Sequence, residues 1–149
     1  MAKLPPNPLV SEVLDAVHKA KTKAKKIEVL REYDSKALRY CLIINFDDSI
    51  VSALPEGDVP FTPNPSPTVE SASKLASEYR TLYNFVKGGN DQLSSTRREV
   101  LFIQLLESLM PSEAEVLCLV KDKKLGKKYR CSFPVVSEAY PDIVWGNRT

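Results

Sequence analysis

RREVLFIQLLESLMPSEAEVLCLVKDKKLGKKYR, residues 97–130, joins the most apolar part of the chain directly to its most basic part. VLFIQLL, residues 100–106, must be buried, whereas KDKKLGKKYR, residues 121–130, must stay in water or meet an acidic partner. Ser95 or Thr96 is expected to cap a helix over residues 96–110, and with Thr96 as the cap, Glu99 completes a capping box. Because apolar side chains nearly encircle its axis, we expect this helix to be the central and most buried element.

Helical patterns continue on both sides of this stretch. Ser112 and Glu115 match a second capping box, which predicts a helix that ends at Lys121. The other predicted helices are one that follows Ser11, one capped by Thr22, one over 36–46 capped by Ser35, one over 68–86, and a last turn or two over 134–140. The run CLIINF, residues 41–46, would also suit a strand, but the spacing and the cap favour a helix. The expected fold is one all-α domain over residues 1–149, a compact bundle of five to six short helices.

Three segments are expected to be non-helical. Residues 1–9 form a proline-punctuated, extended N-terminal arm. Residues 55–67, PEGDVPFTPNPSP, hold five of the eleven prolines, so they form a stiff loop that crosses between two helical halves. The alternative for this loop is an exposed polyproline-type ligand with Phe61 as its only aromatic residue. Residues 121–130 are expected to form a basic loop, or a short strand over 128–133.

Composition and charge exclude several classes of protein. A net charge of +2, from 21 basic and 19 acidic residues, gives no global field toward nucleic acid or membrane, so any electrostatic role must come from local clusters. Three widely spaced cysteines, Cys41, Cys118 and Cys131, argue against a disulfide framework and for a reducing cytoplasm. No apolar run approaches the roughly 20 residues that a membrane span needs, and the N-terminus lacks the apolar region of a signal peptide.

The motifs of catalysis are missing from the sequence. There is no P-loop, GxGxxG or GxSxG pattern, and a single histidine, His18, together with cysteines outside CxxC spacing argues against a metal site. The isolated carboxylates Glu99, Glu107 and Glu113 carry no signature of their own. We therefore expect no enzyme activity, no catalytic or metal-binding residues, no cofactor and no small-molecule substrate.

Two basic clusters remain as candidate binding segments. The first contains Lys19, Lys21, Lys23, Lys25 and Lys26, and the second contains Lys123, Lys124, Lys127, Lys128, Tyr129 and Arg130. Such lysine runs are most often solvated edges. They would also suit the phosphates of a nucleic acid, with Tyr129 stacking on an unpaired base. Joint action of the two clusters requires that they share one face, which the sequence does not determine.

Several phrases together resemble a family of small proteins of T-even-like tailed phages, including phages of cyanobacteria. They are EVLDAVHKAKTKAKKIEVLREYDSKALR (12–39), LPEGDVPFTPN (54–64), FVKGG (85–89), RREVLFIQLLESLMPSEAEVLCLVKDKKL (97–125) and VVSEAYPDIVWG (135–146). The resemblance covers nearly the whole chain and carries no catalytic motif. It implies a protein made in the cytoplasm of an infected bacterium, where small phage proteins commonly bind polymerase or replication machinery.

The leading hypothesis is a non-catalytic phage protein that modulates a host or phage transcription or replication complex through protein–protein binding. Its expected contacts are Phe61 in the proline loop and the six residues of the second cluster, from Lys123 to Arg130. The alternative is a sequence-independent nucleic-acid-binding protein that uses segments 19–26 and 121–130. A second alternative is a structural component of the virion.

Overall fold

The computed structural model describes residues 8–55, 57, 59–62 and 73–146, and within them the fold is all-α, as predicted. The elements in this part of the chain are α1 (Val10–Lys19), α2 (Lys23–Glu32), α3 (Lys36–Phe46), α4 (Leu75–Glu78), the 3₁₀ helix η1 (Tyr79–Phe85), α5 (Ser95–Ser108), α6 (Pro111–Lys121), α7 (Leu125–Tyr129) and α8 (Phe133–Ala139). Extended pairing among these residues is limited to two isolated bridges, Ser52 with Val86 and Ser73 with Leu109. Residues 1–7 of the expected N-terminal arm lie outside the described residues, as do residues 56, 58 and 63–67 of the proline loop.

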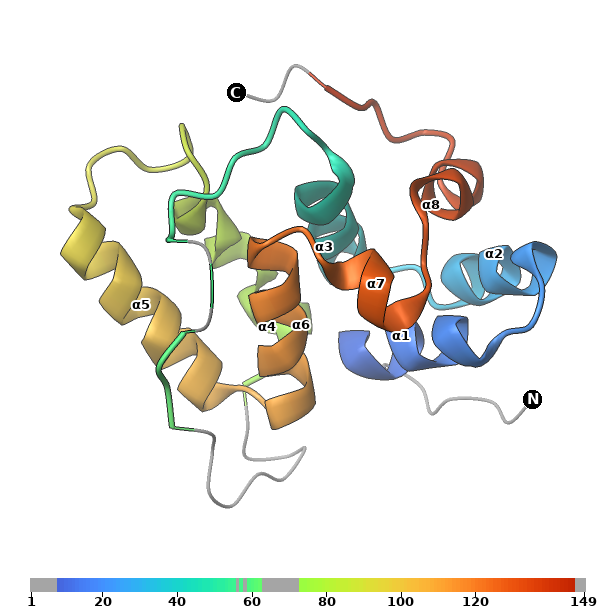
Figure 1. Ribbon diagram of the computed structural model, residues 1–149, viewed down its shortest axis with the longest axis horizontal. Helices are drawn as coiled ribbons and strands as arrows, with labels where there is room; N and C mark the ends of the chain where they lie inside the picture. Colours follow the sequence, from blue (N-terminus) through green and yellow to red (C-terminus); the bar gives the residue numbers. More distant parts are fainter. Residues whose placement is uncertain (1–7, 56, 58, 63–72, 147–149) are drawn as a thin grey trace.

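The helices form an elongated assembly with α6 near its centre (Figure 1). α5 lies at one end of the molecule, and the α1–α2 hairpin lies at the other, with α8 packed against α2. α6 contacts α1, α3, α5 and α7, so it joins the two ends. One continuous cluster of buried apolar side chains runs through all of these helices.

The central helix is therefore α6, and the expectation that residues 96–110 would be the most buried element is wrong. In α5 only Phe102, Leu105 and Leu106 are buried, and Val100 remains 39% exposed. The helix lies at the edge of the assembly, where only one of its faces meets other elements. Apolar residues occur on all sides of α5 in sequence, yet other helices pack against only one of its sides.

Three of the expected helix starts are also displaced. α1 begins at Val10 with Leu9 as its N-cap residue, so Ser11 lies inside the helix instead of before it. α5 is capped by Ser94, whose Oγ accepts a hydrogen bond from the Arg97 backbone N–H at 3.1 Å, instead of by Thr96. α6 begins at Pro111, which suits a first helical turn because it has no N–H to satisfy, so Ser112 lies inside the helix. Several residues near these helix starts have side chains that can act as an N-cap. The helix starts at the residue that places its apolar face against the core.

The starts of α2 and α3 are confirmed. Thr22 Oγ1 accepts a hydrogen bond from Lys25 N at 3.2 Å, and Ser35 Oγ accepts one from Leu38 N at 3.1 Å. Each hydroxyl satisfies one of the N–H groups that the first turn of a helix leaves without an intrahelical partner. Residues 41–46 are helical, as the spacing and the Ser35 cap indicated.

The helix expected over residues 68–86 is divided in the part that the structure describes. α4 makes one α-helical turn, and the chain then tightens into the 3₁₀ helix η1. The buried residues of η1 are Tyr79, Leu82 and Phe85, which are spaced three apart. A helix with three residues per turn places all of them on one ridge, whereas an α-helix would rotate them progressively away from the core.

Glu113 on α6 is fully buried and anchors two other helices. Its Oε2 accepts a hydrogen bond from Val10 N at 3.0 Å, and its Oε1 accepts one from Leu75 N at 3.1 Å. Val10 and Leu75 are the first residues of α1 and α4, so one carboxylate satisfies a free N–H at the start of each helix. Burial raises the pKa of Glu113, an effect that these two hydrogen bonds and Lys74 reduce.

Candidate functional site

An open groove of about 820 Å³ lies between the end of α3, part of α7 and the start of α8. We call it the aromatic–basic groove. It is lined by Asn45, Phe46, Asp48, Lys123, Gly126, Lys127, Arg130, Cys131, Ser132 and Phe133. The groove contains three of the residues predicted from the second basic cluster, so it is the best candidate for a binding site.

Residues 125–129 of the basic segment fold as α7, so the loop expected over 121–130 is wrong for this stretch, and the alternative strand over 128–133 does not form. Residues 122–124 form the turn that joins α6 to α7. Asn45 Oδ1 accepts a hydrogen bond from Leu125 N at 3.0 Å, which caps the start of the helix from α3. Gly126 then faces the following turn, because a Cβ there would lie 2.8 Å from the carbonyl oxygen of Cys131. The lysine pattern of the segment alone does not predict these contacts, because one of them comes from α3, about 80 residues earlier in the chain.

Lys123 is an anchor of the groove floor and is only partly exposed. Its Nζ donates hydrogen bonds to the carbonyl oxygens of Ile44 and Asp47, both at 2.8 Å, at the end of α3. Desolvation lowers the pKa of Lys123, and the charges of Asp48 and Asp47 partly offset that effect. Its ammonium group therefore stabilises the end of α3 through the macrodipole as well as through direct bonds.

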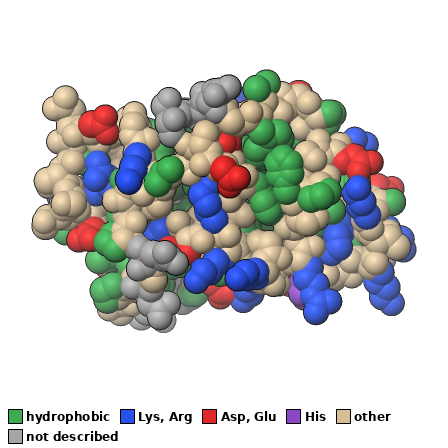
Figure 2. Space-filling view, turned by 45° about the horizontal axis from the view of Figure 1, so that its top comes forward, with side chains coloured by type: hydrophobic (Ala, Val, Ile, Leu, Met, Phe, Trp, Pro, Cys, Tyr) green, Lys and Arg blue, Asp and Glu red, His purple; other side chains and the backbone are tan. Residues whose placement is uncertain are grey.

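Phe46 and Phe133 line one wall of the groove, and Trp145 packs against Phe133; we call these three residues the aromatic shelf. The ring centroids of Phe133 lie 6.4 Å from Phe46 and 5.0 Å from Trp145, and Phe133 remains 38% exposed. The C-terminal tail that carries Trp145 is held by Asp47, whose Oδ2 accepts a hydrogen bond from Gly146 N at 3.0 Å. Figure 2 shows apolar side chains gathered where these elements meet.

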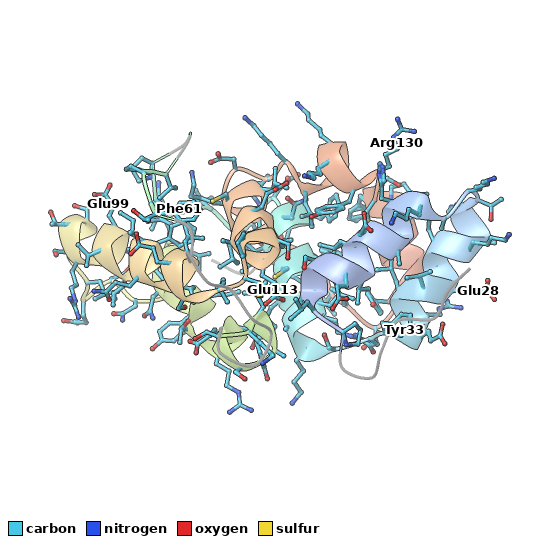
Figure 3. All side chains as sticks on the ribbon, turned by 90° about the horizontal axis from the view of Figure 1, so that it is seen from below. Glu28, Tyr33, Phe61, Glu99, Glu113 and Arg130 are labelled. Carbon is cyan, nitrogen blue, oxygen red and sulfur yellow. The ribbon has the colours of Figure 1, made fainter. Side chains whose placement is uncertain are left out.

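The basic rim of the groove is formed by Lys127 and Arg130. Both are exposed, and neither forms an ion pair within the described part of the chain. Arg130 adopts a left-handed conformation with φ of 52°, and its side chain points away from the body of the molecule (Figure 3). Asp48 is the acidic residue of the lining, so the cations outnumber the acids at this groove.

The remaining predicted residues of the second cluster have separate environments. Lys124 is exposed, and Lys128 pairs with Glu115 on α6. Tyr129 is only 6% exposed, so its ring cannot stack on a nucleic-acid base, as the sequence had suggested it would. Burial raises the pKa of Tyr129.

The first basic cluster lies at the turn between α1 and α2. Lys19 pairs with Asp15 at 2.9 Å, and Lys23 pairs with Glu138 of α8, also at 2.9 Å. Lys26 donates a hydrogen bond to the carbonyl oxygen of Val17 at 2.7 Å. The two residues that remain are Lys21 and Lys25, which are exposed.

Phe61 lies apart from both clusters, near α5 (Figure 3). It is half-buried and packs against the core. The chain next to it is held where Thr62 N donates a hydrogen bond to Glu107 Oε2 at 2.8 Å. Phe61 is therefore a docked residue, and its ring is not presented as an exposed ligand.

The start of the same loop is held by Lys121, the last residue of α6, whose ammonium group is buried. Its Nζ donates hydrogen bonds to the carbonyl oxygens of Pro55 at 2.7 Å and Gly57 at 2.9 Å, and it pairs with Asp122 at 2.7 Å. Asp122 in turn accepts a hydrogen bond from Gly57 N at 3.2 Å. These bonds fix the described part of the loop against the end of α6.

The aromatic shelf is the part of the groove that the sequence did not predict. Phe46 is the last residue of α3, Phe133 is the first residue of α8, and Trp145 lies in the tail after α8, without a motif that they share. Only their tertiary contacts identify them as one surface.

Two searches of the described residues give negative findings. None of the helices there combines the length and the apolar composition that crossing a bilayer requires. Nor does that part of the chain bring together three or more His, Cys, Asp or Glu side chains in a group suited to a metal ion.

Comparison with known proteins gives one match. A model described as a family of unknown function, DUF6433, matches residues 13–127, which is most of the chain and runs from within α1 to within α7. No curated protein and no solved structure shows significant similarity.

Proposed function

We propose that this chain, which belongs to the DUF6433 family of unknown function, is a non-catalytic interaction protein of a tailed phage. It binds a protein of the host or phage transcription or replication machinery in the cytoplasm of the infected bacterium. The phage setting is supported by the sequence phrases that resemble proteins of T-even-like phages. The binding role is supported by the aromatic–basic groove.

The observation that carries the proposal is the exposed Phe133 between aromatic neighbours and the cations Lys127 and Arg130. Exposed aromatic residues beside a basic rim are typical of binding hot spots, because the ring fills a pocket and the rim selects charge. The matching partner is an acidic segment that carries an apolar side chain.

The chemical groups around the groove support binding more than catalysis. Burial raises the pKa of Cys131 to about 11, so its thiol stays protonated at neutral pH and is a poor nucleophile. Lys123 is engaged with two carbonyl oxygens. Of the carboxylates noted in the sequence, Glu107 and Glu113 hold backbone N–H groups.

The proposal is tested by affinity purification from infected-cell lysate with wild-type protein, Phe133→Ala and Lys127→Glu/Arg130→Glu as baits, followed by mass spectrometry. We expect a component of the transcription or replication machinery to be recovered by the wild type and lost with both variants. Tyr83→Ala is the matched control, because Tyr83 is an aromatic residue, 52% exposed, on η1 away from the groove.

Folding of each bait is checked by circular dichroism, since Phe133 also packs against Phe46 and Trp145. Recovery of the bait alone would contradict the proposal. So would a machinery component that binds the wild type and Phe133→Ala equally well.

A further inference from the structure

Five cations in the two basic clusters form no ion pair within the described residues. They are Lys21, Lys25, Lys124, Lys127 and Arg130, and all five are exposed. The other basic side chains of these clusters are occupied by acids or by carbonyl oxygens, as described above. The structure thus separates the cations that are available for a ligand from those that stabilise the fold.

The two clusters lie next to each other, although about one hundred residues separate them along the chain. α1 packs against α7, and α2 packs against α8, so the α1–α2 turn lies beside the α7–α8 junction. Two electrostatic effects agree with this: Lys26 lowers the pKa of Cys131, and Asp15 raises that of Lys128. Figure 2 shows Lys and Arg side chains along the lower edge of one face, from below α7 to the α1–α2 end.

Three nearby acids do not oppose the available cations, because each one already has a lysine partner. Asp15 pairs with Lys19, Glu115 with Lys128, and Glu138 with Lys23. Two further acids partly offset the five cations: Glu28 lies one helical turn from Lys25 on α2, and Asp48 lines the groove together with Lys127 and Arg130. The available cations still outnumber these two acids. The surface between the two turns is therefore locally positive on a chain whose net charge is only +2.

We infer that the α1–α2 turn and α7 form one basic face, made of the five cations above, which binds the phosphate backbone of a nucleic acid without reading bases. Spread over two elements, the cations suit a polymer of regularly spaced phosphates better than one compact anion. Because Tyr129 is buried, the face offers no stacking ring from this segment, so binding rests on phosphate contacts alone.

This basic face goes beyond the proposed protein-binding function, although the two sites share Lys127 and Arg130. Lys21 and Lys25 lie on α1–α2 and are not part of the groove lining. Conversely, Phe133 belongs to the groove and carries no charge. Variants at these positions therefore distinguish the two sites.

The test is the binding of a fluorescein-labelled, mixed-sequence 20-nucleotide single strand, measured by fluorescence anisotropy over a series of salt concentrations. If all five cations contact phosphates, the logarithm of the association constant should fall by about 3.5 per tenfold rise in salt, at roughly 0.7 per phosphate. Lys21→Glu/Lys25→Glu and Lys127→Glu/Arg130→Glu should each reduce this slope by about 1.4 and weaken binding on the order of tenfold or more at low salt.

The matched control is Lys87→Glu/Arg97→Glu, which makes the same change in net charge. Both residues are exposed, and they lie beside η1 and at the start of α5, at the other end of the molecule (Figure 1). We expect this control and Phe133→Ala to retain the wild-type slope.

Three outcomes would overturn the inference. The oligonucleotide does not bind at 20 mM salt, the control variant loses as much affinity as the test variants, or only Lys127→Glu/Arg130→Glu weakens binding while Lys21→Glu/Lys25→Glu does not. Binding of poly-glutamate competitor in place of the oligonucleotide would also overturn it, and would assign the face to an acidic protein. Failure here leaves the protein-binding proposal intact, because that proposal depends on Phe133.

Discussion

Glu113 stabilises the fold by accepting two backbone hydrogen bonds at a fully buried position. A buried carboxylate is costly unless hydrogen bonds replace its hydration, and here two backbone N–H groups from different helices do so. The arrangement joins the starts of α1 and α4 to α6, so this single side chain influences three elements.

We predict that Glu113→Ala lowers the free energy of unfolding by about 2–4 kcal/mol, since it leaves two buried N–H groups without acceptors. Urea denaturation followed by far-UV circular dichroism measures the change. Glu115→Gln is the control on the same helix. It removes only a surface ion pair with Lys128, so the loss should stay within about 1 kcal/mol. Equal losses in the two variants would argue against the role assigned to Glu113.

A second prediction at Glu113 concerns pH. Because burial raises its pKa, the folded state binds a proton more readily than the unfolded state in the pH range just above the ordinary pKa of 4.5. This group therefore favours the folded state at low pH, and that contribution is lost as the pH rises through the folded pKa. Lys74 and Glu12 act on it in opposite directions.

The measurement is urea denaturation of the wild type and Glu113→Gln at a series of pH values between 4 and 7. We expect the stability of the wild type, relative to Glu113→Gln, to decline as the pH rises. A difference that stays constant, or that grows with pH, would contradict the raised pKa.

At the scale of the element, the end of α6 determines where the described part of the proline loop lies. The Lys121 side chain is 2% exposed, and its three acceptors are two loop carbonyl oxygens and Asp122. Prolines restrict the loop in the unfolded chain as well, so less entropy is lost when it docks. The loop is thus attached by a few polar bonds at its start and by the packing of Phe61 farther along.

We predict that Lys121→Met costs about 3–5 kcal/mol, because it removes the cation of a buried ion pair, so that Asp122 loses its charge partner and two carbonyl oxygens lose their donor. The amide of Gly57 should also exchange its hydrogen faster, which hydrogen-exchange mass spectrometry or NMR detects. Lys128→Met is the control, with an expected cost within about 1 kcal/mol because its ion pair is at the surface. An unchanged rate of hydrogen exchange at the Gly57 amide would show that the Lys121 hydrogen bonds do not hold the loop in place.

At the scale of the molecule, the two ends share one core through α6. The C-terminal part of the chain closes this core: Tyr140 is buried, its hydroxyl donates a hydrogen bond to the carbonyl oxygen of Leu30, and Arg39 lies 4.4 Å from its ring centroid. Arg31 also donates hydrogen bonds to the carbonyl oxygens of Glu138 and Ala139. Residues from the first quarter and the last tenth of the chain therefore depend on each other.

We predict a single cooperative unfolding transition. Trp145, the only tryptophan, reports on the tail beside Phe133, while far-UV circular dichroism reports on all helices. The two signals should give the same midpoint in urea. A tryptophan transition at clearly lower urea would show that the tail opens independently of the rest.

The sequence by itself determined the all-α class and several helix starts. Thr22 and Ser35 act as caps where the pattern placed them, because a cap is a local interaction between a side chain and the next turn. The sequence also identified the segment that carries Lys127 and Arg130, since clustered charge is visible in a short window.

Only the tertiary structure decided which helix is central, which lysines are available and where the aromatic shelf lies. Glu113 illustrates the reason: the N–H groups that donate to its carboxylate belong to Val10 and Leu75, which lie 103 and 38 residues away. Burial and ion pairing depend on such distant neighbours, and a local pattern contains no information about them. Lys123 and Lys127 look alike in sequence, yet one fastens the end of α3 and the other faces solvent, because only Lys123 lies within reach of the carbonyl oxygens of Ile44 and Asp47.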